Sequence, residues 1–177
     1  MSKNGQLGQI VAPLSTPVIY EVARMFRVQL GLGDVARICP VRILEGAQLV
    51  GLVELEIVED EEFEPRTEAI TYPDLKWMKI RRSVYDGAYA GNRRYRFTLA
   101  HEIGHLILHK DMAGYARLEP GIKRFFHDPE YQANAFAAAL LMDERHIHKE
   151  MSEEEVMSLF EVSKSAAKAR LAALRGS

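Results

Sequence analysis

Two histidines and a glutamate lie in the pattern His101-Glu102-Ile103-Gly104-His105, the stretch of this chain with the clearest chemical meaning. On a helix, residues four apart lie about 40° apart around the axis and roughly 6 Å apart along it. Both imidazoles can therefore bind one metal ion, and zinc accepts such nitrogens in catalytic sites that have three protein ligands. Glu102 would lie beside the ion as the base that takes a proton from the attacking water.

The residues around this motif are almost all apolar, which predicts a buried helix. They are Phe97, Leu99, Ala100, Ile103, Leu106, Ile107 and Leu108. Burying two histidines and a glutamate in such a helix costs free energy unless these groups have partners. A metal ion is the simplest partner; the other interpretation is that the histidines make ordinary polar contacts in a core helix.

A third ligand must come from outside this helix, and Glu130 is the candidate. Asp128 and Pro129 predict the start of a helix that continues to Met142. Its many alanines allow close approach to another helix. The alternative role for Glu130 is to complement the helix dipole. Asn134, one turn later on the same face, is predicted to orient a carboxylate from behind the site.

Three other residues have the chemistry for a part in such a site. His109 lies roughly 12 Å along the axis from His101, too far for both to bind one ion. It is predicted to lie at the helix end, where it interacts favourably with the C-terminal dipole. His127 is a candidate to support the site or stabilise an oxyanion. Cys39 could bind the metal as a latch; otherwise it is a small buried hydrophobe.

The remaining pattern predicts an α+β fold. A helix is predicted from Pro17 to Leu30. Pro40 to Ile57, Ala69 to Tyr72 and Met78 to Tyr85 are predicted to be extended. We expect a small, mostly antiparallel sheet that packs with the first helix on the two metal-site helices.

Two charged stretches follow one another. Acidic residues at 59–64 predict a solvated loop. Residues 76–96 interleave lysines and arginines with Trp77, Tyr85, Tyr89 and Tyr95, a combination found in grooves for single-stranded nucleic acid. The alternative is an edge strand protected by charge, and the acidic loop could pair with it.

The end of the chain predicts two short helices. Ser152 and Glu155 form a capping box, and Ser163 can cap the second helix, which ends near Arg175. Their outline is that of a helix-turn-helix, which could read DNA, but an alanine-rich helix packed on the domain explains the same residues. We expect a metallopeptidase domain at 1–150 and a helical appendage at 151–177.

The length, charge and cysteine content of the chain are those of an ordinary globular protein. The chain has 177 residues, is 47% hydrophobic and 27% charged, and carries a formal net charge of −2. It can bury a core, and it has no global attraction to nucleic acid or membrane. A single cysteine excludes an internal disulfide. With no apolar stretch of signal-peptide or transmembrane type, we expect a cytoplasmic protein.

The segments RFTLAHEIGHLILH and EYQANAFAAALLM resemble the ImmA/IrrE family of bacterial and phage metallopeptidases. The resemblance covers roughly Ile80 to Met142. It implies a zincin-like α+β metallopeptidase fold, in which His101, His105 and Glu130 bind zinc and Glu102 is the base. Asp143 stands where the family usually has proline, a difference that should affect the helix end and not the metal site.

The resemblance also implies a regulatory role. Family members cleave, or promote the loss of, a helix-turn-helix transcriptional repressor, which derepresses a stress response, a mobile element or an antiphage system. Single-stranded DNA is an expected activator. The alternative function is that of a non-proteolytic regulatory module that binds a repressor or single-stranded DNA.

Overall fold

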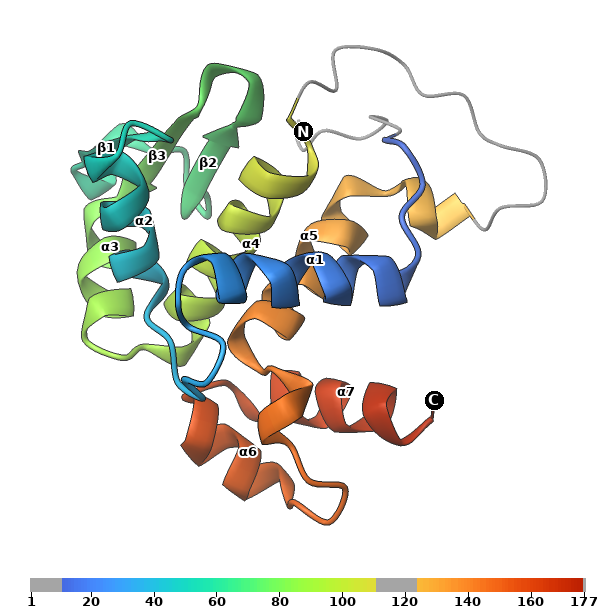
Figure 1. Ribbon diagram of the computed structural model, residues 1–177. Coiled ribbons are helices and arrows are strands. Elements are labelled where there is room, and N and C mark those ends of the chain that lie inside the picture. The colour runs from blue at the N-terminus through green and yellow to red at the C-terminus, as the bar shows by residue number, and fades with distance from the viewer. Residues whose placement is uncertain (1–10, 111–123, 177) are drawn as a thin grey trace.

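The computed structural model describes residues 11–110 and 124–176, which form an α+β fold. Figure 1 shows the sheet with two helices at one end of the molecule and the last two helices at the other. The helices and strands are α1 (Thr16–Gln29), α2 (Pro40–Leu49), β1 (Glu54–Val58), β2 (Ala69–Tyr72), β3 (Trp77–Arg81), α3 (Arg82–Tyr89), α4 (Arg93–Leu108), α5 (Pro129–Leu141), α6 (Glu153–Phe160) and α7 (Lys164–Arg175).

Capping residues set the starts of α5, α6 and α7, three of the helices that the sequence predicted. The Asp128 carboxylate accepts a hydrogen bond from the backbone N–H of Glu130 at the start of α5, with Pro129 in the first turn. Ser152 and Glu155 form the expected capping box of α6. Side-chain oxygens satisfy backbone donors that otherwise lack partners in the first turn of a helix. These two helix starts, and that of α7 at Ser163, therefore follow from local sequence.

Two of the strand predictions were wrong over part of their length. Residues 40–49 form α2, because Pro40, Val41 and Leu44 share one helical face that is buried in the core. The predicted strand at 78–85 ends at Arg81, where α3 begins and buries Val84. In both places the sequence was predicted to be extended, but burial at helical spacing decided the structure.

The sheet has the order β1-β3-β2. β3 pairs antiparallel with β2, with Thr71 opposite Met78, and parallel with β1, with Ile57 opposite Ile80. The sheet is therefore mixed, whereas a mostly antiparallel one was predicted. Strand β2 forms one edge and packs against α4, the helix that carries the two histidines.

The acidic loop pairs with the basic segment that follows it. Glu62 lies 4.0 Å from the Lys79 ammonium, and Glu59 lies 2.6 Å from the Arg82 guanidinium. Residues 76–96 are divided among β3, α3 and the start of α4. The segment is thus no single strand, and part of its charge is matched within the chain.

Helices α6 and α7 share the core with the rest of the fold. Phe160, Ala167 and Leu171 are buried in the same apolar cluster as residues of α4 and α5. The buried Arg96 guanidinium at the start of α4 donates hydrogen bonds to the carbonyls of Ile38, at 2.8 Å, and Phe160, at 3.2 Å. No helix within the described ranges is long and apolar enough to cross a membrane.

Helices α4 and α5 approach closely at Gly104. A Cβ at this position would lie 3.1 Å from the backbone of Ala133 and 3.3 Å from the Phe136 ring. Backbone atoms cannot move aside as a flexible side chain can. The glycine inside the histidine motif therefore sets the separation of the two helices.

We expect Gly104→Ala to lower the free energy of unfolding by about 1–2 kcal/mol, because overpacking outweighs the gain in helix propensity. Gly46→Ala in the exposed part of α2 is the matched control, since a Cβ there meets nothing within 4 Å. It should raise stability by up to about 1 kcal/mol. Urea denaturation measures both, and equal effects would contradict the packing argument.

Candidate metal centre

The two histidines of α4 converge on one point. The Nε2 atoms of His101 and His105 lie 2.9 Å apart, and their ring centroids lie 4.7 Å apart. Both side chains are mostly buried, with 16% and 13% of their surface exposed. The helical spacing in the sequence thus produces two imidazole nitrogens on the same side of α4.

Glu130 supplies a third donor from the first turn of α5. Its Oε2 lies 3.2 Å from His101 Nε2, and its Oε1 lies 3.3 Å from His105 Nε2. In the part of the chain that the structure describes, these three residues are the one group found with donor atoms suited to a metal, all within 4.8 Å of one another. The Glu130 side chain is 57% exposed, so the centre is open to solvent on this side.

The donor set fits a zinc ion. Donors of a tetrahedral ion with bonds of about 2.0–2.1 Å lie about 3.3 Å apart, and the separations here are 2.9, 3.2 and 3.3 Å. Two imidazole nitrogens and a carboxylate repel one another through their lone pairs unless a proton or a metal cation lies among them. In the residues described here, no basic side chain forms an ion pair with Glu130 apart from the two histidines. Two imidazoles and one carboxylate form a ligand set typical of catalytic zinc.

Glu102 is held beside this group by a residue that the sequence analysis missed. The Thr71 hydroxyl, on the edge strand β2, donates a 2.6 Å hydrogen bond to Glu102 Oε2. Thr71 is 9% exposed, and Glu102 is partly buried. Nothing in the sequence around Thr71 indicates this contact, because the two residues are 31 positions apart.

Asn134 contacts a histidine and not the carboxylate that it was predicted to orient. Its Oδ1 lies 3.0 Å from His101 Nδ1. As an acceptor, this oxygen keeps the proton of a neutral His101 on Nδ1 and leaves Nε2 free to bind a cation. The one-turn spacing from Glu130 predicted the correct face of α5 but the wrong partner.

His109 has a different role from the one predicted for it. The His109 side chain is buried at the helix end, with only 6% of its surface exposed. Its Nδ1 lies 2.9 Å from His105 Nδ1, and its Nε2 lies 3.0 Å from Gln132 Oε1. Burial, with the positive charge of a protonated His105, lowers the pKa of His109 to about 4. The ring is therefore neutral near pH 7.

Charge at the centre favours a cation among the three donors. Hydrogen bonds from His101 and His105 hold the pKa of Glu130 far below its usual range. Burial opposes protonation of His101, but its bond to Glu130 and the nearby carboxylates outweigh this and raise its pKa. Both directions have one cause, which is the attraction between the Glu130 carboxylate and the protonated rings at the point where these groups meet.

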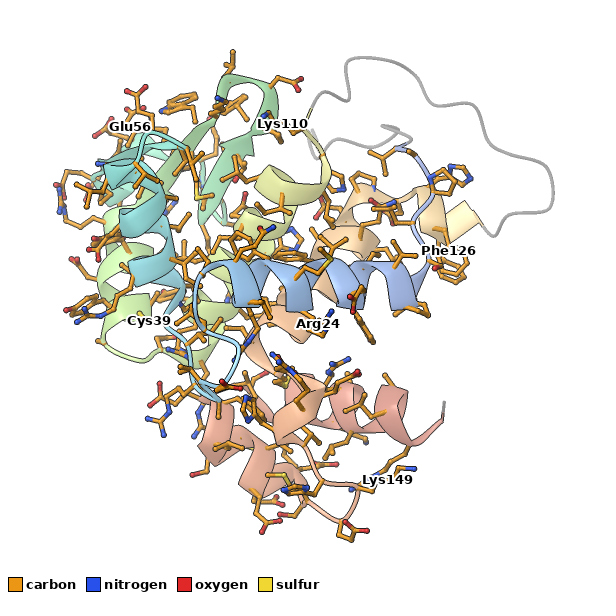
Figure 2. The ribbon with its side chains drawn as sticks, viewed as in Figure 1. Arg24, Cys39, Glu56, Lys110, Phe126 and Lys149 are labelled. Atoms are coloured by element: carbon orange, nitrogen blue, oxygen red, sulfur yellow. The ribbon has the colours of Figure 1, made fainter. Side chains whose placement is uncertain are left out.

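The structure does not bring His127 or Cys39 into this group. The His127 ring is buried, and its Nδ1 lies 3.1 Å from the carbonyl oxygen of Val11. Cys39 precedes α2 and packs against the core. Figure 2 shows it across the molecule from Phe126, which lies shortly before the start of α5. Neither placement supports the oxyanion or latch interpretation.

Comparison with protein families gives an independent result. The model of the IrrE N-terminal-like domain, Peptidase_M78, matches residues 65–172, which is more than half of the chain. The chain belongs to this family. The family is one of metallopeptidases, which agrees with the resemblance found from the two helical segments. Searches of curated proteins and of solved structures gave no match.

Acid should destabilise the metal-free protein partly through His109. Its folded-state pKa of about 4 lies below the unfolded value of about 6.5, so the unfolded chain binds the extra proton as pH falls. This contribution is full above pH 6.5 and is lost toward pH 4, by roughly 3 kcal/mol in total. With a chelator present, urea denaturation of His109→Leu should show a weaker dependence on pH than the wild type.

The exposed His148 provides the control, because His148→Leu should leave the pH dependence of the wild type unchanged. An identical pH dependence in His109→Leu and the wild type would mean that His109 titrates normally in the folded protein.

Proposed function

We propose that the protein is a zinc-dependent endopeptidase, with His101, His105 and Glu130 as ligands and Glu102 as general base. The observation that carries the proposal is the convergence of the three donor atoms, with a partly buried glutamate next to them in the sequence and held by Thr71. A purely structural metal site needs no such glutamate. The family match supports peptide hydrolysis as the reaction class.

The protein groups divide the chemistry as follows. Zinc, when bound, would polarise the scissile carbonyl and lower the pKa of the water that attacks it. Thr71 binds Glu102 Oε2, which leaves Oε1 free to accept the proton from that water. Glu102 then passes the proton to the leaving amine. Asn134 holds the proton of His101 on Nδ1, away from the ligand nitrogen.

The proposed substrate is a helix-turn-helix transcriptional repressor, and its cleavage would derepress a stress, mobile-element or antiphage response. Support for this substrate is the resemblance to the ImmA/IrrE family, and the family match agrees with a protein substrate. Activation by single-stranded DNA has weaker support, because Lys79, Arg82 and Arg94 already pair with glutamates of the chain. Salt-dependent binding of a single-stranded oligonucleotide would test it.

Metal content of the purified protein tests the ligand set. We expect one zinc per chain in the wild type and strong loss in Glu130→Ala, because the variant keeps only two donors. Glu61→Ala is a matched control, since it removes an exposed acid of the loop after β1. Wild-type protein that holds no metal after purification with zinc would favour the non-proteolytic module.

Glu102→Gln tests the general base. Glutamine has a similar shape but cannot take a proton. Zinc content should therefore be unchanged, and the rate of repressor cleavage should fall by about 10²- to 10⁴-fold. Digestion of a helix-turn-helix repressor encoded nearby is followed by mass spectrometry. Retained cleavage would remove Glu102 from this role.

Thr71→Val should lower kcat by about tenfold with zinc content unchanged, because Glu102 loses the hydroxyl that orients it. Thr71→Ser keeps the hydroxyl and should retain most of the rate. Equal rates in the serine and valine variants would show that the hydrogen bond does not matter.

A further inference from the structure

Gln132 is a fully buried polar side chain on α5, held in one orientation by the backbone. Its Nε2 donates hydrogen bonds to the carbonyl oxygens of Ala12, at 2.8 Å, and Phe126, at 2.7 Å. A flipped amide would place its oxygen against these two acceptors, which is unfavourable. The Oε1 atom must therefore point the other way, where it lies 3.0 Å from His109 Nε2.

This orientation decides where His109 carries its proton. An amide oxygen only accepts hydrogen bonds, so His109 Nε2 must be the donor. A neutral imidazole has one N–H, and His109 Nδ1 is then an acceptor. It lies 2.9 Å from His105 Nδ1, which must in turn be the donor. The proton of His105 is thus on Nδ1, and its Nε2 has a free lone pair directed at Glu130.

We propose that His109 and Gln132 are positioning residues that fix the metal-binding tautomer of His105. In the opposite tautomer, His105 would carry its proton on Nε2 and could not bind a cation there. The proposal rests on the proposed zinc centre. It assigns a function to two buried polar residues that neither bind the metal nor touch the substrate.

The arrangement extends from the metal centre to the main chain in three steps. His105 lies in α4, and His109 is the residue that directly follows this helix. Gln132 lies in α5, and it donates to the backbone carbonyls at positions 12 and 126. The two segments that supply these carbonyls are held together in turn, because Leu14 N–H donates to the Phe126 carbonyl and Val11 N–H donates to the His127 carbonyl. His101 has a shorter support, a single contact with Asn134.

Nitrogen-15 NMR of the metal-free wild type tests the assignment directly, since long-range proton–nitrogen spectra show which ring nitrogen is protonated. At pH 7.5 we expect the proton on Nε2 of His109 and on Nδ1 of His105. A proton on Nδ1 of His109 would overturn the proposal. This readout requires neither zinc nor substrate.

Zinc affinity, measured by competition with a chromophoric chelator, tests the consequence. Gln132→Met and His109→Leu each remove hydrogen-bonding groups and put an apolar side chain in the buried space. Each variant should bind zinc about 10- to 100-fold more weakly than the wild type. His109→Asn places an oxygen near the position of Nδ1 and should bind within about threefold of the wild type. His148→Leu, the loss of an exposed histidine, should have no effect.

The outcomes separate this proposal from the function proposed above. Unchanged affinity in Gln132→Met and His109→Leu would overturn the positioning role but leave the zinc centre in place. Absence of zinc binding in the wild type would overturn the zinc centre and the metal-related role together, whereas the NMR spectrum would still establish or reject the tautomers. Circular dichroism identifies any variant that does not fold, and the wild-type spectrum then decides alone.

Discussion

The close approach of α4 and α5 is the constraint on which the site depends. The proposed metal ligands come from both helices, and Glu130 reaches the histidines only because Gly104 lets the backbone of Ala133 come near. Small residues on both sides, glycine on α4 and alanines on α5, allow this separation. Figure 1 shows that α1 lies against α5 and that α6 and α7 lie beyond its C-terminal end. The surrounding helices therefore support α4 and α5, the two helices that carry the three donor residues.

The centre brings together polar groups whose burial would cost free energy if each lacked a partner. Two buried imidazole nitrogens and a carboxylate converge, and each imidazole has its other nitrogen occupied by a protein group. Such a buried polar network is stable only if every member has a partner. Asn134, His109 and Gln132 complete the network behind the ligands. Among the residues described, no lysine or arginine forms an ion pair with Glu130 at the point where the three donors meet.

The sheet contributes through its edge. β2 is a short strand of four residues, yet it carries Thr71, which holds the proposed base. β3 lies between β2 and β1 and keeps this edge in place through Met78 and Ile80, both fully buried. The charged loop between β1 and β2 pairs with β3 and α3 on the surface, where such contacts are worth little individually. The fold thus separates a solvated, charged side from the side that positions Glu102.

The sequence by itself predicted the parts of the site that lie within one helix. His101, Glu102 and His105 follow from a four-residue spacing, and the position of Glu130 follows from the cap at Asp128. Local capping chemistry and helical periodicity act within a few residues, so they can be read without the fold. The same reasoning failed at 40–49, where a short apolar stretch was compatible with both a strand and a helix.

Only the tertiary structure decided which groups meet from distant parts of the chain. The contact of Thr71 with Glu102 spans 31 positions, and those of Gln132 with Ala12 and with His109 span 120 and 23. No periodicity links such residues, because their contacts depend on how whole elements pack. His109 lies at the end of α4, as the sequence predicted, but packing against α5 makes it a buried neighbour of His105 and not a cation beside the helix dipole. Spacing along α4 and the cap of α5 placed the proposed ligands on their helices, while the packing of separate elements brought these ligands together and fixed the groups that orient them.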